Sequence, residues 1–287
     1  MRLNLDKFSE LQQRIITGIL GAITILTAIM WSEWTYFSLF FFISMFALWE
    51  FYKLLGLDGN SPLRMFGTFN GLFLFTLSFL IERFALNPNY YILLLVSLSG
   101  AYFIKLYKKG ETKPFHNIAF TFLGIIYVAL PFALLNIAVF KDQKYYYEII
   151  LGSLFILWAN DTGAYFSGKN FGKRKLFVRI SPKKTWEGSI GGGILALIVG
   201  TTWGYFYQET LFLWQWIGIS VIIIVVGTYG DLVESLFKRS MSIKDSGSVL
   251  PGHGGFLDRF DGLLIAAPFI VAFLRVVPII IEEFFGK

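Results

Sequence analysis

The sequence contains no cysteine, only two histidines and few charged residues. Without cysteine the chain can form no disulfide, thiolate nucleophile or cysteine-based zinc site, and His116 and His253 alone argue against a histidine-rich metal cage. Charged residues make up 15% of the 287 residues, whereas soluble domains carry about 25%. Hydrophobic residues make up 55%, a balance that suits a chain folded in a lipid bilayer.

Long apolar runs follow one another along the chain. A helix crosses a bilayer with roughly 20 mostly apolar residues. No small-residue cleavage pattern follows Trp31, so we interpret the first run as a span and not as a signal peptide. We therefore expect an all-α integral membrane protein with about nine transmembrane helices, about five of them in an N-terminal region, 1–145, and the others in a C-terminal catalytic region, 146–287. The nine segments are 15–31, 34–55, 66–82, 90–107, 118–140, 149–168, 188–207, 212–237 and 262–281.

The basic residues predict the orientation of these spans. Cytoplasmic loops of membrane proteins carry an excess of lysine and arginine. If the N-terminus is cytoplasmic, twenty of the 25 basic residues lie on cytoplasmic segments and four on outer segments. The polar loops 169–187 and 238–261 then face the cytoplasm together, where we expect a polar catalytic cavity. The net charge of +6 is thus explained by topology, and no nucleic-acid partner is expected.

Acidic residues at membrane depth are costly and usually functional. Asp161 follows Asn160 in the sixth span, and Asp231 closes the eighth apolar run. The alternatives are a helix–helix hydrogen bond for Asp161 and a solvated helix end for Asp231. Glu234 and Lys238 share a helical face with Asp231. We interpret Glu234 as part of an ordinary solvated ion pair, and Asp231 as a functional residue.

The segment 244–262 holds the densest set of residues suited to phosphate chemistry. Its five glycines and one proline exclude a continuous helix, and glycine backbone N–H groups can approach an anion closely. Asp258 and Asp261 are three residues apart and would share a face if this turn is helical. Paired carboxylates suit Mg²⁺, and Arg259 could hold a phosphate through two hydrogen bonds. The alternative is a loop that only connects two helices.

The loop 169–187 supplies further cations. For the cluster 173–175 we favour contact with anionic lipid headgroups or a role in topology. Lys183 and Lys184 precede the seventh span, where they could hold a triphosphate or a phosphatidate headgroup, and a role in topology alone fits each of them equally well. His253 is expected to contact phosphate or to be structural, because a phosphate monoester is already anionic and needs little activation by a base.

The segments 235–239, 244–245 and 251–261 together resemble the signature of the CDP-diacylglycerol synthases, or phosphatidate cytidylyltransferases. The resemblance runs over the 27 residues 235–261, and the segments 160–165 and 181–188 are similar to two further motifs of that family. It covers about 158–262, whereas the N-terminal half matches only as a series of hydrophobic spans.

The resemblance implies a nine-span homodimer, and the basic residues predict an active site on the cytoplasmic side. We expect a bacterial plasma membrane and not an organelle, because the chain is short. The resemblance also implies transfer of CMP from CTP to phosphatidic acid, with Mg²⁺ as the cofactor, alone or with a monovalent cation such as K⁺. The metal ligands would be Asp231 and Asp258, with Asp261 nearby. The expected catalytic residues are Asp231, Asp258, Asp261, Lys183 and Lys244. The expected substrate contacts are Asn160, Asp161, Lys184, Lys238, Arg239, Asp245, His253, Gly254, Gly255 and Arg259.

Three other functions remain open at this point. Another CTP-dependent lipid enzyme, such as a polyprenol kinase or an archaeal lipid cytidylyltransferase, would share acidic residues and phosphate loops. A transporter would also place acids in the membrane, but no inverted repeat is apparent. A structural scaffold would leave the carboxylates of 231–261 unexplained.

Overall fold

The computed structural model describes residues 10–57, 59–243, 247 and 254–286. Within them, eight helices are long and apolar enough to cross a membrane, and they match the second to the ninth predicted segments. The expectation of an all-α membrane protein is therefore confirmed. The first predicted segment lies in α1, whose apolar stretch Ile16–Trp31 is shorter, so a ninth crossing stays a prediction.

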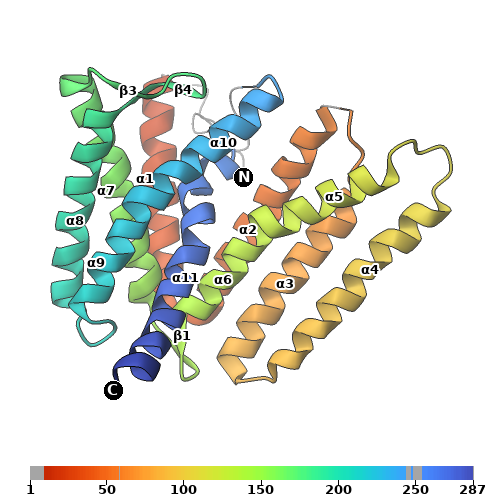
Figure 1. The fold of residues 1–287 in the computed structure, drawn as a ribbon, viewed down its shortest axis with the longest axis horizontal. Coiled ribbons are helices and arrows are strands. Elements are labelled where there is room, and N and C mark those ends of the chain that lie inside the picture. Colours follow the sequence, from red (N-terminus) through yellow and green to blue (C-terminus); the bar gives the residue numbers. More distant parts are fainter. Residues whose placement is uncertain (1–9, 58, 244–246, 248–253, 287) are drawn as a thin grey trace.

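The N-terminal half is a series of antiparallel helices (Figure 1). The last predicted span of this half contains a π-helical turn, Ile125–Ala129, just before Pro131. Proline lacks the N–H that a regular helix needs at this point, which accounts for the local change in winding. The helices are α1 (Glu10–Trp31), α2 (Glu33–Leu57), α3 (Arg64–Phe84), α4 (Ile92–Tyr107), α5 (Pro114–Gly124) and α6 (Leu130–Val139).

One short antiparallel hairpin precedes the C-terminal half and another lies within it, and neither was predicted. The first, β1 (Phe140–Lys141) with β2 (Lys144–Tyr145), links α6 to α7, so the boundary expected after residue 145 falls between β2 and α7. The second, β3 (Lys175–Phe177) with β4 (Ser181–Thr185), lies in the predicted polar loop 169–187. The helices are α7 (Tyr147–Phe171), α8 (Trp186–Phe206), α9 (Leu213–Ile222), α10 (Thr228–Ser240) and α11 (Leu257–Phe285).

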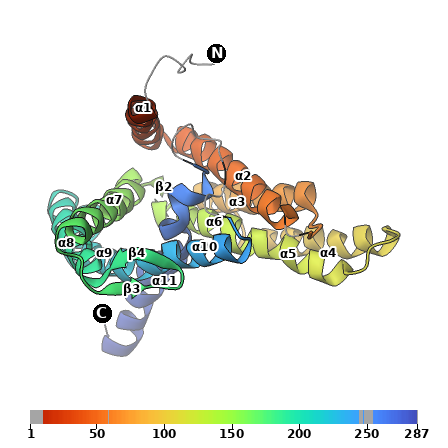
Figure 2. The ribbon, with the colours of Figure 1, turned by 90° about the horizontal axis from the view of Figure 1, so that it is seen from above.

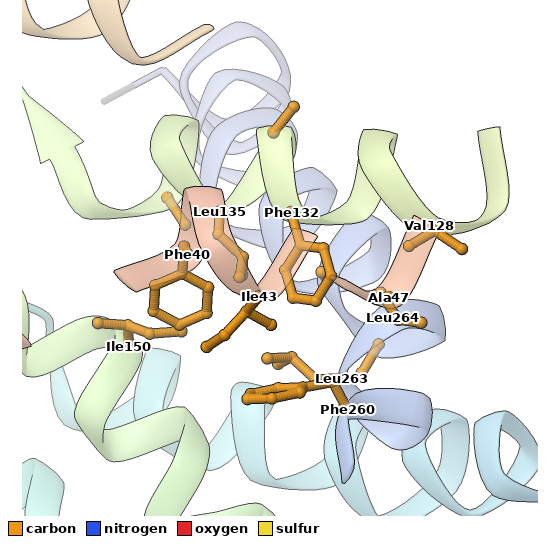
Figure 3. Close-up of a cluster of buried hydrophobic side chains, with 14 of the residues drawn as sticks. Phe40, Ile43, Ala47, Val128, Phe132, Leu135, Ile150, Phe260, Leu263 and Leu264 are labelled. Atoms are coloured by element: carbon orange, nitrogen blue, oxygen red, sulfur yellow. The ribbon is translucent and has the colours of Figure 1, made fainter. Parts of the chain in front are cut away.

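Four helices from both halves meet in a shared hydrophobic centre (Figure 3). Figure 2 shows α7, α8 and α9 at one side of the molecule and α4 and α5 at the other, with α3, α6, α10 and α11 between them. The helix α11 packs against α6 and α2 as well as α10, so the two halves share one core. The labelled centre consists of Phe40, Ile43, Ala47, Val128, Phe132, Leu135, Ile150, Phe260, Leu263 and Leu264.

Glycines bring α7 and α8 into close contact. A Cβ atom on Gly163 of α7 would lie 2.9 Å from the Cα atom of Gly192 on α8. Small residues let helix backbones approach closely, which is the usual way that membrane helices pack tightly. The contact holds the end of α7 beside the start of α8, where the polar cavity described below is found.

Candidate functional site

A cavity of about 390 Å³ opens between α7, the start of α8 and the junction of α10 with α11. It lies at the end of the bundle that carries β3 and β4 (Figure 1). A π-helical turn, Ile223–Gly227, directly precedes α10 and contributes Gly227 to the wall. Turns of this kind occur often at functional sites. The polar and charged lining residues are Asn160, Asp161, Tyr165, Lys169, Lys183, Lys184, Thr185, Ser189, Thr228, Asp231 and Asp261.

Three carboxylates from three different helices line this cavity. Asp161 comes from α7, Asp231 from the first turn of α10, and Asp261 from the second turn of α11. Like charges gathered at membrane depth are costly unless they have a partner or a function.

Two of the three lysines that line the cavity, Lys183 and Lys184, come from β4, and the third, Lys169, comes from α7. Lys184 forms an ion pair with Asp231, with 2.5 Å between Nζ and Oδ2, while Lys183 lines the wall beside it. The strand ends in Thr185, whose Oγ1 accepts a hydrogen bond from Gly188 N at 3.2 Å and so caps the start of α8. This cap fixes the point at which the chain turns from strand to helix, and with it the position of both lysines.

Asp258 has a different environment. Its Oδ1 accepts a hydrogen bond from Lys238 Nζ at 2.7 Å, and its Oδ2 accepts one from Gly255 N at 3.2 Å. Lys238 also pairs with Glu234 at 2.5 Å. Asp258 is not among the residues that line the cavity, although Asp261 is. The i,i+3 spacing therefore brings only one of these two aspartates to the cavity wall.

The ion pair expected for Glu234 is confirmed, but the expectation that it is solvated is wrong. Glu234 is 1% exposed, because the side of α10 that carries it packs against α11. On the same helix, Ser235 Oγ donates to Asp231 Oδ1 at 3.4 Å, as the predicted shared face requires.

The other predicted residues fall into four groups. Asn160 lines the cavity and is 5% exposed, and its Oδ1 has no hydrogen-bond partner among the described residues. Arg239 and Arg259 are exposed and lie outside the lining. Gly254 has φ of 81°, a conformation that favours glycine, and with Gly255 it forms the turn before Asp258. Lys244, Asp245 and His253 lie outside the described residues.

Comparison with known proteins adds a decisive observation. Residues 12–277 match the profile of the cytidylyltransferase family, a span of almost the whole chain. The chain belongs to the cytidylyltransferase family. A relative from Bacillus subtilis strain 168, named phosphatidate cytidylyltransferase, is 35% identical over 266 residues, which cover 91% of this chain and 96% of the relative.

Two further relatives of this cytidylyltransferase carry the same name. The protein from Haemophilus influenzae strain Rd is 33% identical over 284 residues, covering 92% of this chain and 98% of the relative. The protein from Staphylococcus aureus strain COL is 42% identical over 156 residues, covering 54% of this chain and 58% of the relative.

One carboxylate near the signature segment of this cytidylyltransferase was not predicted. Glu50, on α2, is 3% exposed, and its Oε2 accepts a hydrogen bond from Leu257 N at 3.0 Å. The signal was present in the sequence, because Glu50 interrupts an apolar run just as Asp161 does. The same argument from membrane depth would have selected it.

Glu187 was also missed as a residue that shapes the site. Its carboxylate accepts hydrogen bonds from the backbone N–H groups of Lys173 and Arg174, at 3.0 Å and 3.1 Å. These bonds close the turn between α7 and β3 against the start of α8. Their effect is to hold the hairpin that carries Lys183 and Lys184 over the cavity.

Proposed function

We propose that this member of the cytidylyltransferase family makes CDP-diacylglycerol and pyrophosphate from CTP and phosphatidic acid. The family and the names of the three relatives support a nucleotidyltransferase that acts on this lipid. The single observation that carries the proposal for the site is the meeting of Asp161, Asp231 and Asp261 with Lys183 and Lys184 in one cavity.

In the proposed reaction, a phosphate oxygen of phosphatidic acid attacks the α-phosphorus of CTP. A new P–O bond forms, the bond between the α- and β-phosphates breaks, and pyrophosphate leaves with its electron pair. Such transfers depend mainly on positioning and on neutralising charge. Lys183 and Lys184 would bind the phosphates, and the ion pair with Asp231 would keep Lys184 extended across the cavity.

The cavity suits Mg²⁺, which prefers oxygen ligands and usually takes one or two carboxylates together with substrate phosphates. Asp231 and Asp261 are the residues that would hold the ion, and the buried Oδ1 of Asn160, which has no partner among the described residues, offers a further oxygen. Among the described residues, no group of three or more Asp, Glu or His side chains is placed so that it could hold a metal ion. Bound Mg²⁺ would neutralise charge on the phosphates.

Asp258 would join these ligands only after exchanging its bond to Lys238 for the metal. We keep it as a proposed ligand on the basis of the signature, and we give Lys238 the role of holding it in the absence of the ion. Lys244 and His253 are proposed phosphate contacts on the same basis. A monovalent cation such as K⁺ would be an addition to this set.

We further propose nine spans with a cytoplasmic N-terminus, in a bacterial plasma membrane, with the cavity facing the cytoplasm where CTP is found. The support is the excess of lysine and arginine at that end of the molecule and the bacterial origin of the relatives. The acyl chains would enter from the side, because they cannot leave hydrocarbon without a large cost. A homodimer is proposed from the family resemblance alone.

The position of the label in CTP tests the reaction. Purified protein would be given phosphatidic acid, Mg²⁺ and CTP labelled on either the α- or the γ-phosphate, with EDTA in a parallel sample. We expect label in the lipid from α-labelled CTP only, and none with EDTA. Lipid labelled from γ-labelled CTP would instead identify a kinase. Preference for a polyprenol or an archaeal ether lipid over phosphatidic acid would overturn the proposed substrate.

A further inference from the structure

A second polar cavity, of about 380 Å³, lies between the α2–α3 connection and the α4–α5 connection. Both connections are at the end of the bundle that carries β3 and β4, but on the side away from α7 and α8 (Figures 1 and 2). The two cavities share no lining residue, and the mechanism above gives this one no role.

Buried polar contacts join the two connections, and three of the residues that make them, Ser61, Glu111 and Asn117, line the cavity. Lys105, which is 4% exposed, donates from Nζ to the carbonyl oxygen of Ser61 at 3.0 Å and to the Glu111 carboxylate. Asn117 Oδ1 accepts a hydrogen bond from Ser61 N at 2.8 Å, while its Nδ2 donates to the same carboxylate. These bonds hold the two connections that line the cavity together in the folded protein.

The charge of the cavity is positive. Lys105 neutralises Glu111 from inside, and Lys108 Nζ lies 3.9 Å from the second carboxylate oxygen. Lys109 and Lys113 also line the cavity and are exposed, and no carboxylate of the described residues lies within ion-pair distance of either. The start of α5 at Pro114 adds the partial positive charge of a helix N-terminus.

Apolar side chains near the cavity in the sequence indicate where it lies relative to the lipid bilayer. Leu106 and Tyr107, at the end of α4, are 74% and 82% exposed, and Phe115, at the start of α5, is 73% exposed. Exposed aliphatic and aromatic side chains next to lysines are typical of the level of lipid headgroups. An occupant of the cavity could therefore place its charge among the lysines and its hydrocarbon beside these three residues.

We propose that this cavity binds the phosphate group of an anionic lipid, at a position separate from the catalytic cavity. Lysines that only set topology need no cavity and no fixed wall, whereas here Lys108, Lys109 and Lys113 converge on a preformed one. A soluble phosphate compound would satisfy the same cations but would make no contact with the apolar side chains of Leu106, Tyr107 and Phe115.

The proposed site is tested by measuring how lipids and inorganic phosphate bind to the full-length protein in detergent micelles. The probes are phosphatidylglycerol, phosphatidylcholine as the neutral lipid, and inorganic phosphate as the soluble anion. We expect saturable binding of phosphatidylglycerol and about thirtyfold weaker binding by Lys109→Gln/Lys113→Gln, since each lysine near an anionic surface contributes about 1 kcal/mol. These two side chains are exposed, so the variant should fold and keep wild-type cytidylyltransferase activity.

Two control variants separate this site from the rest of the protein. Lys141→Gln/Lys144→Gln removes the same charge at the β1–β2 hairpin, at the opposite end, and should bind as wild type does. Lys183→Gln/Lys184→Gln alters the catalytic cavity and should still bind phosphatidylglycerol, whether or not the proposed reaction is correct. Equal binding by wild type and Lys109→Gln/Lys113→Gln would overturn the proposal, as would equal binding of the two lipids. Binding of inorganic phosphate alone would overturn the assignment to a lipid.

Discussion

Glu50 on α2 accepts a hydrogen bond from the backbone N–H of Leu257, the first residue of α11, across 207 positions of sequence. The helix α11 supplies both Asp258 and Asp261. A carboxylate at a helix N-terminus stabilises the unpaired N–H groups there. The N-terminal half of the chain thus takes part in placing the acidic residues of the catalytic half.

We predict that Glu50→Ala lowers both stability and turnover. Loss of a hydrogen bond to a charged group costs about 1.5–3 kcal/mol, and the freed start of α11 would displace Asp261. Glu50→Gln keeps an acceptor and should retain more activity than Glu50→Ala. The measurements are the melting temperature in detergent and kcat and KM for CTP.

Glu33 offers a control on the same helix. It forms a partly exposed ion pair with Arg83 at 3.1 Å, at the end of α2 away from the cavity. Exposed pairs contribute about 0–1 kcal/mol, so Glu33→Gln should leave turnover unchanged. Equal loss of activity in Glu33→Gln and Glu50→Ala would show that the effect of Glu50 is not specific to α11.

A second prediction concerns the buried cluster of Lys238 with Glu234 and Asp258. Lys238→Met would leave two carboxylates buried without their cation, and breaking a buried pair in this way costs about 3–5 kcal/mol. We expect a large fall in the melting temperature. The double variant Lys238→Met/Glu234→Gln should recover part of it, because one of the two buried carboxyl groups is then replaced by a neutral amide. No recovery would contradict the account of this cluster as a set of compensating charges.

A third prediction concerns the contact between α7 and α8. Gly163→Ala should destabilise the protein and reduce activity, because the new Cβ atom would lie 2.9 Å from backbone of α8. Gly21 on α1 is the matched control, since a Cβ atom there would meet nothing within 4 Å. Gly21→Ala should be neutral or stabilising by about 0.5–1 kcal/mol. Similar melting temperatures for the two variants would argue against the close packing of α7 and α8.

A fourth prediction gives the pH dependence of the second cavity. Burial opposes ionisation of Glu111, but the hydrogen bonds from Lys105 and Asn117 outweigh it and lower the pKa of this carboxyl. A carboxyl group whose pKa is lower in the folded state stabilises that state at any pH above its pKa in the unfolded chain, about 4.3 for glutamate. This stabilisation is lost as the pH falls through the pKa in the folded state. The difference in stability between wild type and Glu111→Gln should therefore be full at pH 7 and shrink below about pH 4. A difference that stays constant with pH would contradict the lowered pKa.

The sequence was sufficient for eight of the nine predicted spans, because a bilayer requires long apolar runs that can be read directly from the residues. It also predicted Asp231 and Lys184 as functional residues, each on its own and without the contact between them. Their ion pair joins β4 to α10, and only the packing of the whole bundle brings the two together. Local spacing suggested that Asp258 and Asp261 act side by side, but Lys238, from another helix, holds Asp258. Contacts between segments that are far apart in the sequence could not be predicted from the local pattern of residues.

The central claim is that CMP is transferred to lipid in the cavity that Asp231 and Asp261 line. Its most direct test compares the rate of CMP incorporation into phosphatidic acid for wild type, Asp231→Asn, Asp261→Asn and Asp142→Asn. Asp142 lies in the turn between β1 and β2 with φ of 51°, a conformation that asparagine also tolerates, so it controls for the substitution itself. We predict a loss of about 100-fold or more for the two cavity variants, the size of effect found when one group that stabilises developing charge is removed, and no loss for Asp142→Asn. Wild-type rates in both cavity variants would contradict the account.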